Sequence, residues 1–147
     1  MPRFLRFALF AILICLVTEP VSAADEDASQ IVHLLKSTFD RPDAALQAEP
    51  VVVVADYAIA DWSQDGRGGR ALLRQHDGSW SIVLCSGDAL KDEKFLADAG
   101  VPSADAPTLA KALAEAETDV TPERLAQFSL FDGTVRMDGG TEHGSHP

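Results

Sequence analysis

The chain has 147 residues, of which 46% are hydrophobic and 24% are charged, and its formal net charge at pH 7 is −11. A chain of this length can bury one hydrophobic core and is too short for two. The acidic balance argues against nucleic acid and anionic membrane surfaces as partners, because both carry negative charge themselves.

The first 23 residues have the pattern of a cleaved secretory leader. Arg3 and Arg6 precede an apolar run from Phe7 to Val17, and a small-x-small sequence ends at Ala23. The alternative is a membrane anchor, but the run is well short of the roughly 20 apolar residues that cross a bilayer. We therefore predict that residues 1–23 are removed and that the remaining chain is periplasmic.

We predict one α+β domain over residues 24–137 and a flexible tail over 138–147. The domain is expected to have an N-terminal helix, a three-stranded antiparallel meander, and then two or three C-terminal helices on one face of the sheet. The first helix follows from apolar residues at helical spacing, between a capping box at Asp27 and a stop at Pro42. His33 lies off the apolar stripe of this helix, so we expect its side chain to be solvated.

The meander is predicted from three runs rich in β-branched and aromatic residues, separated by turns that contain glycine. The runs are 51–62, 70–75 and 80–86, and the turns are 65–69 and 76–79. Strict alternation in the third run sets Trp80 and Leu84 on one face of the sheet and Cys85 on the other. One face of this sheet needs a cover, which the helices must supply.

Three helix starts are predicted after the sheet, each marked by a capping residue or a proline. The first helix runs from about Ala89 to Asp98, the second runs through Pro107 to Glu117, and the third starts at Thr121. Residues 129–137 fit either a last strand or a loop, and both alternatives stay open.

The C-terminal end of the chain holds candidate metal ligands. His143 and His146 form an H-x-x-H pair, and Met137 precedes them by six residues. Imidazole is a good ligand for copper and zinc, and a thioether favours copper(I). We therefore predict that His143, His146 and Met137 bind copper, in an open site suited to capture and hand-over. The alternative is a tail that happens to contain two of the four histidines.

Cys85 is the only cysteine of the mature chain, because Cys15 lies in the leader, so no intramolecular disulfide can form. Because Cys85 ends an apolar strand, we expect its side chain to be buried. The alternative is an exposed thiol that takes part in metal binding or redox chemistry. A cysteine nucleophile needs a base within hydrogen-bond reach. The predicted hairpin sets the candidate base, His76, about 17 Å away, five residues at ~3.3 Å each. We therefore predict no enzymatic activity, with a thiol enzyme built on Cys85 as the alternative.

Asp56, Asp61 and Asp88 could form a carboxylate cluster for a hard cation. Asp56 and Asp61 are five residues apart in one predicted strand, so they point to opposite faces unless a bulge intervenes. Solvated or capping positions are therefore expected for these carboxylates. The arginines of the second strand are expected to be ion-pair partners on the acidic surface: Arg67, Arg70 and Arg74.

Four segments and the histidine-bearing end of the chain carry a resemblance to a known family. The segments are YAIADWSQDGRGGRALLR, DGSWSIVLCSGDAL, LADAGVP and TPERLAQFSLFDGTVRMD. Together they resemble the small exported proteins of proteobacteria named copper uptake system-associated proteins. The resemblance extends from about Val51 to Pro147. It implies a periplasmic role beside copper acquisition or delivery, together with another periplasmic or membrane copper-handling protein, and it supplies no catalytic residues.

The leading prediction is thus a periplasmic accessory protein of copper uptake or delivery, which binds copper weakly through its C-terminal tail. The alternative is a periplasmic protein-binding or inhibitory module without a metal role. That module would meet its partner through the strand edge at Val51 or through the surface around Trp62 and Trp80. We predict no nucleic-acid partner and no membrane span after the leader is removed.

Overall fold

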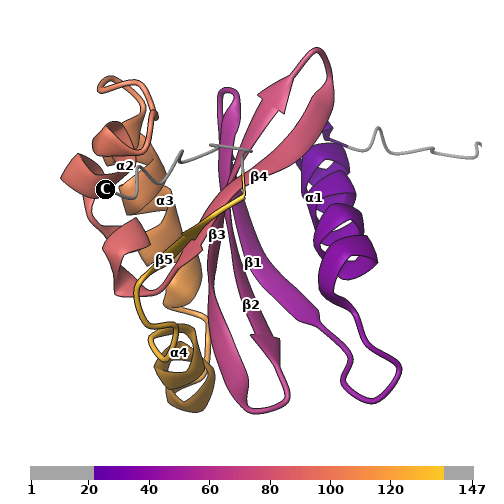
Figure 1. Cartoon of the computed structure of the whole chain (residues 1–147). Helices are drawn as coiled ribbons and strands as arrows, with labels where there is room; N and C mark the ends of the chain where they lie inside the picture. The colour runs from indigo at the N-terminus through magenta and orange to yellow at the C-terminus, as the bar shows by residue number, and fades with distance from the viewer. Residues whose placement is uncertain (1–21, 138–147) are drawn as a thin grey trace, which may run out of the picture.

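The computed structural model describes residues 22–137, and Figure 1 shows a sheet between two helical layers. In chain order the elements are α1 (Ala23–Phe39), β1 (Gln47–Val54), β2 (Tyr57–Gln64), β3 (Arg67–His76), β4 (Ser79–Ser86), the 3-10 helix η1 (Asp88–Lys91), α2 (Glu93–Asp98), α3 (Ala106–Glu117), α4 (Pro122–Phe128) and β5 (Thr134–Arg136). The α+β class is confirmed. The sheet has five antiparallel strands in the order β1-β2-β3-β4-β5, so the predicted three-stranded meander is too small.

The segment predicted as one strand over 51–62 is a hairpin. Val54 pairs with Tyr57, and the turn between them contains Ala55, whose φ is +50°. Positive φ is uncommon for a residue with a Cβ atom, and the turn has no glycine or asparagine to signal it. The sequence across this turn therefore has the pattern of one continuous apolar strand.

The sheet is buried on both faces, because α1 packs against one face and the C-terminal helices pack against the other (Figure 1). The α1 face holds Ile31 and Leu35 of the helix against small and apolar strand residues such as Ala60. The opposite face holds Ile59 and Leu72 against leucines of the C-terminal helices. Successive side chains of β2 and β3 point to opposite faces of the sheet, so each strand contributes residues to both cores, as expected for strands covered on both sides.

A β-bulge in β4 changes the face of the sheet to which the following side chains point. Leu72 of β3 pairs with Leu84 and Leu73 pairs with Ile82, so Val83 is the extra residue. Beyond the bulge, Leu84 lies on the face of the C-terminal helices and Cys85 lies on the α1 face. The predicted strict alternation is therefore wrong after Ile82, because a bulge inserts one residue without a partner.

The N-terminal helix begins at Ala23 and ends at Phe39, before Pro42 as predicted. Asp27 is not its N-cap. Its carboxylate instead accepts hydrogen bonds from the Trp80 indole N–H at 3.0 Å and from the Gln75 side-chain amide at 3.1 Å. This contact joins the helix to the sheet. His33 is exposed on the helix, as predicted.

The C-terminal helices largely start where their capping residues predict. The Thr121 hydroxyl accepts from the Arg124 backbone N–H at the start of α4, and α3 ends at Glu117. The predicted helix from Ala89 is shorter, because η1 comes first and Asp92 then caps α2. Within residues 22–137, no helix has the length and apolar character that a bilayer span requires.

Glycines let the segment after α4 lie against the sheet. A Cβ atom on Gly68 would come within 2.8 Å of the Gln127 carbonyl oxygen, and one on Gly69 within 2.9 Å of the Phe131 side chain. The sequence assigns both glycines to a turn, but they belong to β3 and permit this approach. The following residues form β5 beside β4, which resolves the open alternative for 129–137 as a loop followed by a three-residue strand.

Candidate functional site

Met137, one of the three predicted metal ligands, lies directly after β5. Its backbone N–H donates to the Val83 carbonyl at 2.8 Å, which continues the pairing of β5 with β4. The residue is 42% exposed. The other two predicted ligands, His143 and His146, lie outside the described residues.

Met137 lines an apolar pocket of about 260 Å³ on the α1 face of the sheet. The walls come from α1 and the segment after it, from β2, β4 and β5, and from the loop that follows α4. The lining residues are Phe39, Leu46, Trp62, Gln64, Cys85, Phe131, Val135 and Met137. Of its two sulfur-containing residues, Cys85 is buried and Met137 is exposed.

Packing around the pocket holds its shape. The Trp62 and Phe131 rings meet edge to face with centroids 5.9 Å apart, an arrangement that aromatic pairs favour. The Gln64 side-chain amide donates to the backbone carbonyls of Phe39 at 2.9 Å and Ala44 at 2.8 Å, which ties the end of α1 to β2. The pocket therefore has a fixed, largely apolar wall.

The predicted burial of Cys85 is confirmed, since 6% of the residue is exposed. Burial raises the pKa of the thiol to about 11, so the thiol is protonated at neutral pH. Cys85 pairs with Ala71, whereas His76 pairs with Ser79 at the far end of the same hairpin, as predicted. The exposed His76 imidazole lies 3.2 Å from the Asp77 carboxylate.

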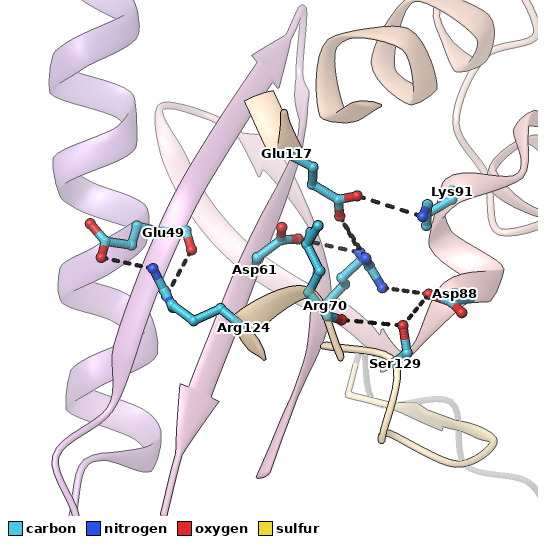
Figure 2. A network of polar contacts seen from close by, with 9 residues as sticks. Glu49, Asp61, Arg70, Asp88, Lys91, Glu117, Arg124 and Ser129 are labelled. Carbon is cyan, nitrogen blue, oxygen red and sulfur yellow. Dashed lines mark hydrogen bonds and ion pairs between the residues drawn. The ribbon is translucent and has the colours of Figure 1, made fainter. Parts of the chain in front are cut away.

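A buried network of charged side chains lies on the opposite face of the sheet (Figure 2). Its centre is Arg70, which is 1% exposed. The Arg70 guanidinium donates to a Glu117 carboxylate oxygen at 2.6 and 2.8 Å and to Asp88 at 3.0 Å. Its Nε atom also lies 3.5 Å from Asp61. The expectation that Arg70 is a surface ion-pair partner is therefore wrong.

Asp61 is fully buried, and neither of its carboxylate oxygens has a hydrogen-bond partner among the described residues. Burial raises the pKa of Asp61 to about 8; the positive charge of Arg70 opposes this shift, and the negative charge of Glu117 adds to it. The expectation of a solvated or capping position holds for the exposed Asp56 and is wrong for Asp61.

The rim of the network is more exposed. The Ser129 hydroxyl donates to Asp88 at 2.8 Å, and the Lys91 ammonium lies 3.6 Å from Glu117. Burial acts to raise the pKa of Asp88, but the Ser129 hydrogen bond and the charges of Arg70 and Lys91 outweigh it and lower the pKa. Asp61 and Asp88 therefore differ: the charged form is disfavoured for Asp61 and favoured for Asp88.

Two guanidinium groups lie over the Phe128 ring. The Arg70 guanidinium lies 5.7 Å from the ring centroid and that of Arg124 lies 5.4 Å from it. The Arg124 guanidinium in turn donates to Glu49 of β1, to the Glu49 carboxylate at 3.0 Å and to the Glu49 backbone carbonyl at 3.1 Å (Figure 2). These contacts join α4 to the sheet and to the first strand.

One sequence signal could have located the network. A two-residue turn at Asp65–Gly66 sets Asp61 directly opposite Arg70, which is the observed register. Opposite charges in a directly paired position form a stabilising cross-strand pair. The long sequence separation of Glu117 leaves no comparable local signal.

Among residues 22–137, no group of three or more His, Cys, Asp or Glu side chains is arranged to hold a metal ion. Fold and site define an α+β protein with a sulfur-containing apolar pocket on one face of its sheet and a buried ion network on the other. No protein-family model, curated protein or solved structure matches the chain.

Proposed function

We propose that this chain is a periplasmic accessory protein of copper uptake or delivery, exported by its N-terminal leader. Copper would be its cargo, captured through Met137, His143 and His146 and passed to another copper-handling protein of the periplasm or membrane. The family resemblance of the sequence motivates this proposal.

The observation that carries the proposal is the position of Met137. Met137 is 42% exposed beside the apolar pocket, and the histidine-bearing segment begins directly after it. A thioether is a soft ligand that suits copper(I), and an exposed ligand can exchange its ion with a partner. The formal charge of −11 favours the approach of cations.

Copper titration of the exported protein tests this function. We expect the native protein to bind copper in competition with a chelator of known affinity, because it has a thioether and two imidazoles on one short segment. A variant that ends at Asp138 should bind at least about tenfold more weakly, a difference of about 1.4 kcal/mol. Equal binding by the two proteins would remove the histidines from the site, and no binding by either would reject the function.

The second candidate is a protein-binding or inhibitory module without a metal role. Three large apolar side chains, those of Leu130, Val135 and Met137, are exposed near one another along the chain, which favours a docking surface there. Trp80 is buried and bonded to Asp27, so it offers little surface to a partner. Under this candidate, Leu130→Ser should leave any copper titration unchanged and abolish capture of the partner.

A further inference from the structure

The Asp61 carboxyl group is buried where no hydrogen-bond donor reaches it. Its side chain is fully buried, and neither of its oxygens accepts a hydrogen bond from a donor among residues 22–137. An ionised carboxylate can only accept, so on burial it loses its hydrogen bonds to water and gains none in return. A protonated carboxyl group instead has one O–H donor and needs one acceptor. The surroundings of Asp61 therefore fit the neutral acid.

Glu117 supplies the acceptor that this proton needs. The Arg70 Nε atom lies 2.8 Å from a Glu117 carboxylate oxygen and 3.5 Å from an Asp61 oxygen, so the two carboxyl groups meet at one nitrogen (Figure 2). Burial is the largest cause of the raised pKa of Asp61, and the charge of Glu117 and a hydrogen bond with its side chain raise it further. When two carboxyl groups share a site, one of them keeps its proton. Glu117 has the shorter contacts with Arg70, so it is the charged member of the pair.

The charges around this pair are matched only while Asp61 is neutral. Arg70 already donates to two carboxylates, those of Glu117 and Asp88. An ionised Asp61 would be the third carboxylate around one guanidinium. The charged groups that face the pair from the surrounding elements are Arg70 of β3, Asp88 and Lys91 of η1, Arg124 of α4 and, bound to Arg124, Glu49 of β1.

The sheet holds Asp61 and Arg70 in place, whereas Glu117 lies where the chain can move. Asp61 and Arg70 are directly paired in the β2–β3 ladder. Glu117 is the last residue of α3, and the last turn of this helix has no basic residue to compensate the negative end of the helix dipole. Repulsion from an ionised Asp61 therefore acts on the last turn of α3, while Leu109 and Leu113 keep the rest of the helix in the core.

We propose that Asp61 and Glu117 share one proton, and that this proton fastens the last turn of α3 to the sheet and releases it when lost at alkaline pH. In the fastened state the Asp61 O–H donates to a Glu117 oxygen. On release the O–H bond breaks, its electron pair stays on the Asp61 oxygen, and the proton passes to solvent. This carboxyl pair is a latch that does not depend on the proposed copper function.

Release of the latch reshapes a groove on the surface. The chain that follows α3 lines a groove of about 480 Å³ together with Glu49 and Pro50 of β1. Asp119, Val120 and Thr121 of this connection form part of the groove wall. The latch is closed at low pH and opens as pH rises through about 8, because the pKa of Asp61 is raised to that value in the folded protein.

Carboxyl ¹³C NMR of the native protein tests the shared proton. The Asp61 Cγ and Glu117 Cδ signals should shift in one common step near pH 8, because coupled carboxyl groups lose the proton as a pair. Glu117→Gln should lower the pKa of Asp61 by at least about one unit, a tenfold change in the acid dissociation constant, since Arg70 stays and the second carboxylate is gone. Asp88→Asn is the matched control, because Asp88 also accepts from Arg70 but from an exposed position. It should move the step by less than about twofold.

Amide hydrogen exchange tests the release of α3. After correction for the intrinsic effect of pH, exchange at residues 114–117 should rise about tenfold from about pH 7 to 9, as the ionised fraction of Asp61 does. Exchange at residues 109–112 should stay within about twofold, because the core holds that part of the helix. In Asp61→Asn the rise should vanish, since the neutral amide donates to Glu117 at every pH in the range.

The two measurements on the native protein decide the proposal even where Glu117→Gln fails to fold. A Glu117 signal that stays constant through the Asp61 step rejects the shared proton, and an Asp61 step in the ordinary range of about 4 rejects it as well. Exchange that rises equally along α3, or that does not rise, rejects the release of its last turn.

Discussion

Replacing Arg70 with methionine should lower the free energy of unfolding by about 3–5 kcal/mol, which is the usual loss when one partner of a buried ion pair is removed. Arg70 is 1% exposed and makes its shortest contact, 2.6 Å, with Glu117, which is also buried. Without the guanidinium, Lys91, at 3.6 Å, would be the one cation among residues 22–137 within ion-pair distance of Glu117. An uncompensated buried carboxylate strongly disfavours the folded state.

Urea unfolding at pH 7 measures this loss, and Arg74→Met is the matched control. Arg74 lies on the same strand and face as Arg70, but it is exposed, and its guanidinium lies over the Tyr57 ring at 5.8 Å from the centroid. The control should therefore change stability by less than about 1 kcal/mol. Equal losses in the two variants would show that the network around Arg70 does not stabilise the fold.

Stability should fall as pH rises from about 5 to 7, by up to about 2–3 kcal/mol, through the single carboxyl of Asp61. Its pKa is 3.8 in an ordinary environment and about 8 in the folded protein, because burial disfavours the charged form. The folded state therefore binds one proton that the unfolded state lacks throughout this range. The contribution is fully present below pH 3.8 and is lost as pH rises toward 8.

Asp61→Asn should remove this pH dependence and should be more stable than the native protein at about pH 8, because the amide is neutral at every pH in the range. The measurement is the free energy of unfolding at each pH. Asp56→Asn is the control, since Asp56 is exposed in the neighbouring turn and its variant should keep the native slope. An unchanged slope in Asp61→Asn would assign the pH dependence to other groups.

Local signals in the sequence predicted most of the helices and the centre of the sheet. The cap at Thr121 and the two-residue turn before Ser79 both lie where their residue types indicate, because capping and turn chemistry act over three or four residues. The hairpin turn at Ala55 could not be predicted, because alanine is not a residue type that usually adopts a positive φ. Pairing and packing of β1 and β2 override the local preference there.

Neither face of the candidate site could be derived fully from the sequence. Cys85 reaches the pocket only because the bulge at Val83 reverses its facing, and a bulge has no local sequence signature here. Glu117 reaches Arg70 from 47 residues away, a contact that depends on how α3 docks on the sheet. Long-range register and helix docking are set by the whole core, not by the residues that meet at the site.

The central proposal is that the protein captures copper through Met137, His143 and His146. The most direct test is X-ray absorption spectroscopy at the copper edge on the protein loaded with one equivalent of copper(I). We expect a first coordination sphere with one sulfur neighbour, from the Met137 thioether, and nitrogen neighbours from imidazole. A first coordination sphere of nitrogen and oxygen alone would contradict the account.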